Sequence, residues 1–133
     1  MIILPQTVVR GKRVFYTNQV NVIDSGSAMV STVIDLSWAV PAAALTVQVF
    51  FDAQLTSGSG GGCSSGAYLQ IVPNYNFAFG LCWVPGAFQV SAQEFSVEIP
   101  NIDQKVYYLW YDMDALYIAR RLFTLFVQGY TLP

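Results

Sequence analysis

The sequence predicts an all-β chain: an eight-stranded antiparallel β-sandwich or barrel, for which a single jelly roll is the closest match in size and strand number. Apolar and polar residues alternate with a period of two along most of the 133 residues, the pattern of half-buried strands. Clusters of Gly, Pro, Asn, Asp and Ser separate these segments at the spacing of a sandwich or barrel. The length fits one domain over residues 1–133, with a short N-terminal arm over about residues 1–7.

The first half of the chain contains three predicted strands. Residues 8–23 are rich in Val, Tyr and Phe and are expected to form one strand with a bend near Thr17. Residues 24–27 (DSGS) have the composition of a turn. Residues 30–38 then alternate, and residues 45–52 are apolar on both faces, which indicates burial between sheets or at an interface.

The second half contains the remaining strands. Residues 56–66 (TSGSGGGCSSG) predict a mobile loop, because glycine loses the most backbone entropy when it is ordered. Two short strands flank the turn residues Pro73 and Asn74, and residues 95–99 and 106–111 continue the alternation. The segment 115–128 fits either a helical stripe or a strand. Its aromatic and β-branched residues favour a strand over 121–130.

The second possible fold is an immunoglobulin-like sandwich. Its hallmark is a tryptophan between two widely spaced cysteines, whereas Trp83 directly follows Cys82 here. The sequence leaves open whether Cys63 and Cys82 form a disulfide. Neither cysteine belongs to a metal-binding pattern.

The charge content argues against catalysis. The chain has no histidine, charged residues make up only 11% of it, and residues 53–93 carry no charge at all. Acid–base chemistry and transition-metal sites usually recruit histidine or paired carboxylates. A soluble domain normally has about 25% charged residues. We therefore expect no enzymatic activity, no cofactor and no metal, and a surface that other chains cover.

Acidic residues form two patterns that have ordinary explanations. Asp112 and Asp114 could start a calcium loop, but no glycine or bidentate glutamate follows at the required spacing. Glu94 and Glu98 would lie about 13 Å apart on one strand, too far for the carboxylate pair of a glycosidase. The first pattern predicts an ordinary turn between two strands, and the second predicts no catalytic pair.

Basic residues are few, and the net charge is −2, which disfavours specific nucleic-acid binding. The exception is a short group near the N-terminus, Arg10, Lys12 and Arg13, which would lie near Arg120 and Arg121 if the chain ends come together. This group predicts either solvated terminal strands or a weak phosphate contact.

The aromatic segment 107–111 presents Tyr107, Leu109 and Tyr111 on one face and Tyr108 and Trp110 on the other. One face should fill the core, while the other could form a subunit interface or stack on sugar rings. The candidate interface residues are Phe50, Tyr108, Trp110, Arg10, Lys12 and Arg13.

Residues 45–52 (LTVQVFFD) and 121–127 (RLFTLFV) are similar to strands of the small single-jelly-roll vertex (penton) proteins of icosahedral, membrane-containing phages. In that family an apolar strand ends in Asp-Asn before a loop, whereas Ala53 follows Asp52 here. The resemblance implies a pentameric vertex protein. Its expected partners are the major capsid shell and either an internal membrane or a spike protein. It carries over no catalytic residue.

These observations predict a virion structural protein, most simply a self-assembling capsid subunit of the vertex type, located in the virion. The alternatives are a carbohydrate-binding or adhesin-type module and a decoration or extracellular filament subunit. We expect no signal peptide, because no basic region precedes the short apolar start. We also expect no transmembrane helix, because no apolar run reaches about 18 residues.

Overall fold

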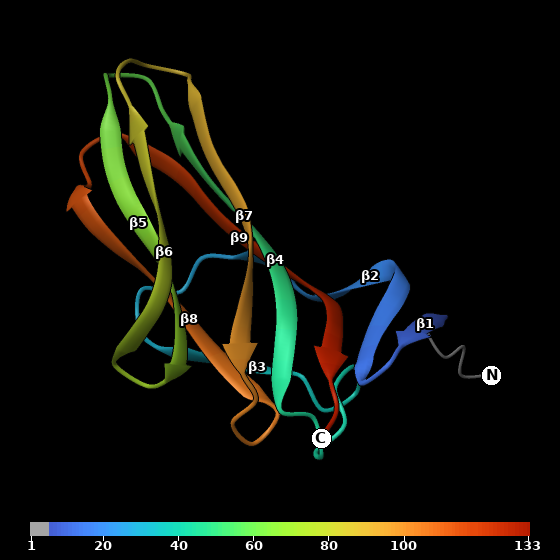
Figure 1. The fold of residues 1–133 in the computed structure, drawn as a ribbon. Coiled ribbons are helices and arrows are strands. Elements are labelled where there is room, and N and C mark those ends of the chain that lie inside the picture. The colour runs from blue at the N-terminus through green and yellow to red at the C-terminus, as the bar shows by residue number, and fades with distance from the viewer. Residues whose placement is uncertain (1–5) are drawn as a thin grey trace.

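The computed structural model of the chain describes residues 6–133, which form nine strands in two antiparallel sheets (Figure 1). The five-stranded sheet has the order β1-β2-β9-β4-β7, and the four-stranded sheet has the order β3-β8-β5-β6. The strands are β1 (Thr7–Arg10), β2 (Arg13–Gly26), β3 (Thr32–Asp35), β4 (Thr46–Ser57), β5 (Cys63–Val72), β6 (Tyr75–Val84), β7 (Val90–Pro100), β8 (Lys105–Asp114) and β9 (Ile118–Thr131).

Eight of these strands pair in a nested way. β5 pairs with β6, β4 with β7, β3 with β8 and β2 with β9, all antiparallel. The chain therefore resembles one long hairpin that turns at Pro73 and Asn74 and is rolled up so that its sides form two facing sheets. Asn74 has a φ of 65°, a conformation that asparagine tolerates in turns.

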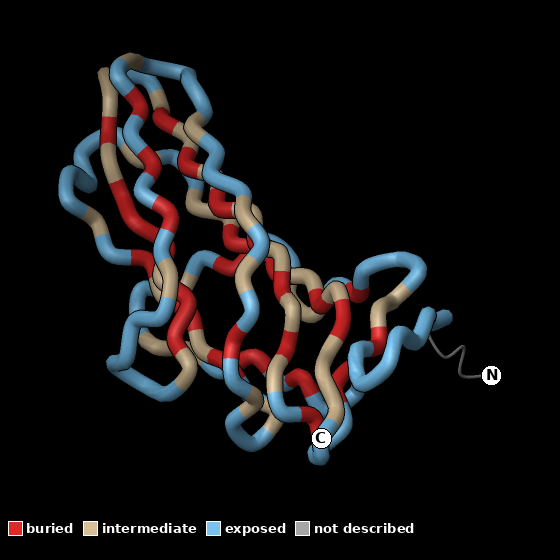
Figure 2. Tube along the Cα trace, viewed as in Figure 1, coloured by how far each residue is buried: buried red, intermediate tan, exposed pale blue. Residues whose placement is uncertain are grey.

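The core lies between the two sheets, and Figure 2 shows buried residues recurring along the strands of both. Alternate residues of β4, from Val47 to Leu55, are fully buried. The ring of Phe123 on β9 stacks on Tyr108 of β8 with centroids 5.0 Å apart. The indole of Trp110 is also buried and donates a 3.1 Å hydrogen bond to the carbonyl of Gly26. Each such large side chain contributes about 1.5–3 kcal/mol on burial.

The prediction of an all-β chain with antiparallel, sandwich-like packing is confirmed, but the strand count was one too low for residues 6–133. The segment 8–23 is not one bent strand. It contains the hairpin β1–β2, which turns at Gly11 and Lys12. Gly11 has a φ of 63°, at the loop position where a two-residue hairpin favours glycine. Thr7 of the predicted arm begins β1, and residues 1–5 of that arm lie outside the described residues.

Three predicted boundaries were wrong. β2 continues through the predicted turn as far as Gly26, with register irregularities that include Ser25 at a φ of 57°. The strand predicted over 30–38 shrinks to β3, because the Asp35 carboxylate accepts a hydrogen bond from the Ser37 amide and the chain then turns. The predicted mobile segment 56–66 is mostly strand, and only residues 58–62 link β4 to β5.

The ambiguous segment near the C-terminus is a strand. β9 spans Ile118–Thr131 and lies between β2 and β4, which confirms the preference for a strand over a helix. Within residues 6–133 the structure has no helix that is long and apolar enough to cross a membrane.

Candidate functional site

Three loops meet at one end of the sandwich and form what we call the tip: residues 58–62, 85–89 and 115–117. They connect β4 to β5, β6 to β7 and β8 to β9. None of these residues is charged. The tip is thus a convergence of three turns that are far apart in the sequence.

Hydrogen bonds join the three loops to one another. The buried Ser57 hydroxyl donates to the carbonyl of Gly86 at 2.7 Å and accepts from the Gln89 amide at 3.0 Å. The Gly58 amide donates to the carbonyl of Tyr117 at 2.7 Å, and the Gly58 carbonyl accepts from the Phe88 amide at 3.1 Å. Residues 57–58 therefore tie the other two loops together, so the tip is built as a unit.

The glycine run in loop 58–62 is explained by the close approach of the loop to the ring of Tyr117 and to the backbone at Val84. A Cβ atom added at Gly60 would lie 2.3 Å from the ring of Tyr117, and one at Gly61 would lie 3.0 Å from it. A Cβ at Gly62 would lie 2.2 Å from the carbonyl oxygen of Val84. The run is needed because loop 58–62 wraps around Tyr117 and lies on the backbone of the β6–β7 connection.

The tip exposes large apolar side chains. Phe88 is 77% exposed, Val90 beside the loop 61% and Leu116 63%. Phe88 and Tyr117 have φ values of 53° and 73°, in the left-handed region that bulky residues rarely adopt. Such conformations persist only where the surroundings impose them, and they cluster at functional sites. The hydrogen bonds of the loops thus hold apolar side chains in solvent at the cost of backbone strain.

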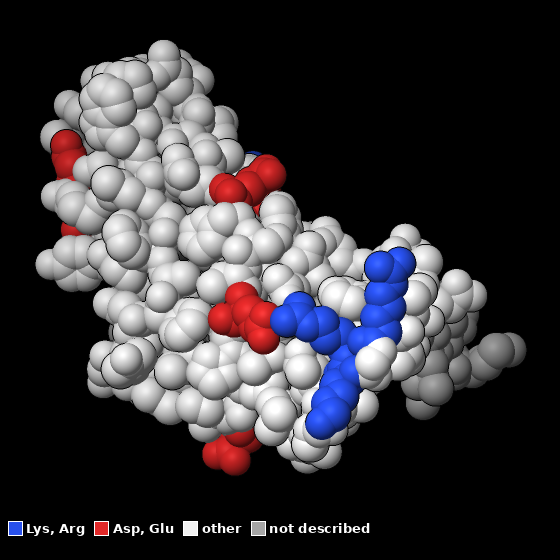
Figure 3. All heavy atoms as spheres, in the orientation of Figure 1, with Lys and Arg blue, Asp and Glu red and all other residues white. Residues whose placement is uncertain are grey.

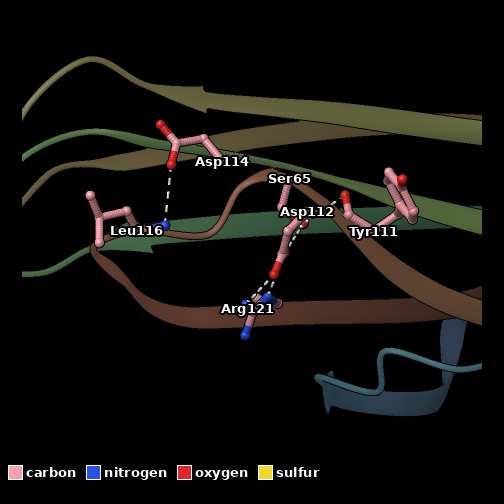
Figure 4. Close-up of polar contacts among 6 residues, drawn as sticks. All are labelled: Ser65, Tyr111, Asp112, Asp114, Leu116 and Arg121. Carbon is pink, nitrogen blue, oxygen red and sulfur yellow. Dashed lines mark hydrogen bonds and ion pairs between the residues drawn. The ribbon is translucent and has the colours of Figure 1, made fainter.

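An ion pair lies behind the tip and links β8 to β9 (Figure 4). Arg121 donates two hydrogen bonds to the Asp112 carboxylate, at 3.0 and 2.6 Å, and the Ser65 hydroxyl donates a third at 2.6 Å. Burial pushes the pKa of Asp112 up, but the bonds from Arg121 and Ser65 and the charge of Arg121 outweigh it and hold that pKa below its usual value. Asp114 accepts a 3.2 Å hydrogen bond from the Leu116 amide. Both acids are the last part of β8 rather than the predicted turn, which lies at residues 115–117, and they anchor the end of the strand from which that loop starts.

A second apolar surface, the neutral face, lies on the outer side of the edge strand β6 and consists of Phe77, Phe79, Leu81 and Trp83. The last three of these are more than half exposed. Phe79 stacks on Tyr68 of β5 with centroids 5.6 Å apart. Beside it lies a shallow cavity of about 340 Å³, lined by Tyr68, Gln70, Asn74, Asn76, Leu109 and Tyr111.

Two of the predicted interface residues are in the core. Tyr108 is 3% exposed and Trp110 is fully buried, because this face of β8 points at the five-stranded sheet. The outward face of β8 is instead that of Tyr107, Leu109 and Tyr111. Phe50 lies half-buried on the outer side of the five-stranded sheet, 6.1 Å from the ring of Phe126.

Arg10, Lys12 and Arg13 lie together at the β1–β2 hairpin, and most Lys and Arg atoms visible in Figure 3 gather there. The expected approach of Arg120 and Arg121 to this group was wrong. Arg13 pairs in register with Thr131, and Arg121 lies ten residues earlier on β9, about 33 Å away at ~3.3 Å per residue.

The described residues contain no cluster of three or more side chains suited to hold a metal ion. Cys63 and Cys82 are buried free thiols, so the expectation that Cys63 sits in a flexible loop was wrong. Burial raises the pKa of the Cys82 thiol to about 11, which leaves it protonated and a poor nucleophile at neutral pH. Glu94 and Glu98 lie on the exposed side of β7.

Sequence reasoning missed Phe88, Leu116 and Tyr117: Phe88 lies between two predicted strands, and Leu116 and Tyr117 lie in the segment 115–128 that fitted either a helix or a strand. The one sequence signal was the uncharged stretch 53–93, which contains Phe88 but not Leu116 or Tyr117. A scan against protein-family models and searches of curated proteins and of solved structures found no match. The fold and the surface chemistry are therefore the grounds on which a function can be proposed.

Proposed function

We propose that this chain is a virion structural protein, a capsid subunit of the vertex type that assembles with copies of itself and contacts the major capsid shell. We also infer that its sandwich is a single jelly roll. The nested pairing of β2 to β9 supports this, because eight antiparallel strands rolled as one long hairpin form two facing four-stranded layers. Here β1 is an additional edge strand.

The tip is the observation that carries the proposal. Jelly rolls occur in capsids and also in lectins, so the fold alone does not decide the function. An uncharged surface with rigidly held Phe88 and Leu116 has little to recognise except other apolar surface. In a closed ring whose subunits point their tips at the symmetry axis, each tip would be covered by its neighbours.

The proposal is tested by light scattering over a range of concentrations. We expect a discrete closed ring, and a double variant, Phe88→Asn with Leu116→Ser, should raise the dissociation constant of the ring at least tenfold. Asparagine is chosen because it tolerates the left-handed backbone at position 88. Trp38→Ser is the control, since Trp38 is 58% exposed but lies outside the tip. A parent protein that stays monomeric at every concentration would overturn the proposal.

The cavity beside the neutral face favours a second candidate function, recognition of a neutral carbohydrate. Aromatic rings and amide groups line it, as in sites that stack on sugar rings and bind hydroxyls. Trp110 cannot take part, because it is buried. If this function holds, Tyr111→Ala should abolish binding to a glycan array while Trp83→Ala, which changes an aromatic residue outside the cavity, should not. An array without binding to the parent protein would exclude this function.

A further inference from the structure

The β1–β2 hairpin carries half of the basic residues of the chain on its exposed edge. Arg13, Val14 and Phe15 of β2 pair with the end of β9, and β2 leaves that pairing only between Phe15 and Val20, so the hairpin turn is held at the end of the five-stranded sheet beside the C-terminus (Figure 1). Arg13 reaches Glu98 at 3.7 Å. Arg10 and Lys12 are exposed and, within residues 6–133, have no carboxylate within ion-pair distance.

Two acidic residues without a basic partner lie on the same sheet. Asp52 of β4 and Glu94 of β7 are directly opposite in the register, an arrangement of like charges that destabilises a sheet. Among residues 6–133 neither has a basic partner. One carboxylate oxygen of Asp52 accepts a 3.0 Å hydrogen bond from Gln54, whereas the other is buried and has no donor in the described part of the chain.

The basic hairpin and the acidic pair cannot meet within one chain. Arg13 is level with Thr131 and Thr46 across the sheet, and Asp52 lies six residues further along β4, about 20 Å away. β1 and β4 are also separated by β2 and β9. This distance exceeds the reach of Arg10 or Lys12, so each group keeps an unmet charge in the monomer.

We propose that a second copy of this chain supplies the missing counter-charges: Arg10 and Lys12 of one subunit form ion pairs with Asp52 and Glu94 of the next. This inference rests on the proposed self-assembly and names the surfaces that join. The contact relieves the repulsion between the two carboxylates by placing two positive charges beside them. In the ring of the proposed function this contact repeats head-to-tail from one subunit to the next, and the ring forms when the rotation closes.

A charge-reversal experiment tests the contact in the full chain. Lys12→Glu and Glu94→Lys, each alone, should raise the dissociation constant of the oligomer at least tenfold at low salt. The two changes together should restore it to within about threefold of the parent, because the pair is then rebuilt with opposite signs. Lys105→Glu is the matched control, since it removes an exposed lysine with the same change of net charge. Urea unfolding of every variant checks that the fold is intact.

The outcomes separate this inference from the proposed function. An oligomer that responds equally to Lys12→Glu and Lys105→Glu, or that the double variant does not restore, overturns the contact but leaves self-assembly standing. A parent protein that never associates overturns both. Weaker association with each single change, and association close to that of the parent with the double change, supports the contact.

Discussion

At the scale of the residue, the carboxylate of Asp112 holds together the strands next to the tip. Its carboxylate binds Arg121 and Ser65 and so joins three strands, β5, β8 and β9. The side chains of Asp112 and Arg121 are 13% and 23% exposed, so water screens this pair less than a surface pair. Charge-assisted bonds of this kind are stronger than neutral ones.

The lowered pKa of Asp112 predicts a pH dependence of stability. Since the folded value lies below the unfolded value of about 3.9, the contribution is complete above that pH and is lost as pH falls through the folded pKa. Asp112→Asn should lower the free energy of unfolding at pH 7 by about 1–3 kcal/mol. Urea titrations at pH 7 and pH 3 should show a smaller loss on acidification for the variant than for the parent. Equal losses would contradict this role.

At the scale of the element, loop 58–62 is shaped by its neighbours. Its glycines differ in what surrounds them: a Cβ at Gly62 would collide with the backbone of Val84, whereas one at Gly58 would lie 3.7 Å from its nearest atoms, an ordinary contact. The loop therefore has room for a side chain at Gly58 but none at Gly62.

This difference predicts opposite results for two identical substitutions. Gly62→Ala should lower the free energy of unfolding by about 1–3 kcal/mol, because backbone must move to admit the methyl group. Gly58→Ala should be neutral or raise stability by up to about 1 kcal/mol, because it reduces the freedom of the unfolded chain. Thermal unfolding of both variants measures the contrast. Similar effects at the two positions would show that the loop is not packed as described.

At the scale of the whole molecule, nested pairing makes the last strand a central one. β9 lies between β2 and β4, and its residues Phe123, Leu125 and Val127 are fully buried. β1, by contrast, is an edge strand with four exposed residues. The two ends of the chain therefore contribute very differently to the core.

Truncation should reveal this asymmetry. A chain that lacks residues 118–133 should lose cooperative unfolding in circular dichroism, because removal of β9 splits the five-stranded sheet. A chain that lacks residues 1–12 should keep a cooperative transition, since the part of this segment that the structure describes, residues 6–12, is an exposed edge strand and its turn. A cooperative transition in the first truncation would mean that β9 is dispensable for the core.

The sequence was a good guide to local structure and a poor one to contacts between distant segments. Period-two alternation correctly marked β4, β7 and β8, and aromatic content correctly predicted a strand over 121–130, which lies within β9. Alternation separates the two faces of β8 but does not say which face the other sheet covers, so Tyr108 and Trp110 were assigned to an interface. The tip could not be predicted, since it depends on backbone hydrogen bonds between residues that lie at least 30 positions apart in the sequence.

The placement of the lysines has a practical consequence. The chain has two, Lys12 in the hairpin and Lys105 at the start of β8, and both lie at the end of the sandwich away from the tip. Amine-reactive chemistry aimed at these lysines would therefore immobilise the protein by that end. A sensor chip prepared in this way would present Phe88 and Leu116 outward, in one orientation, to whatever flows past.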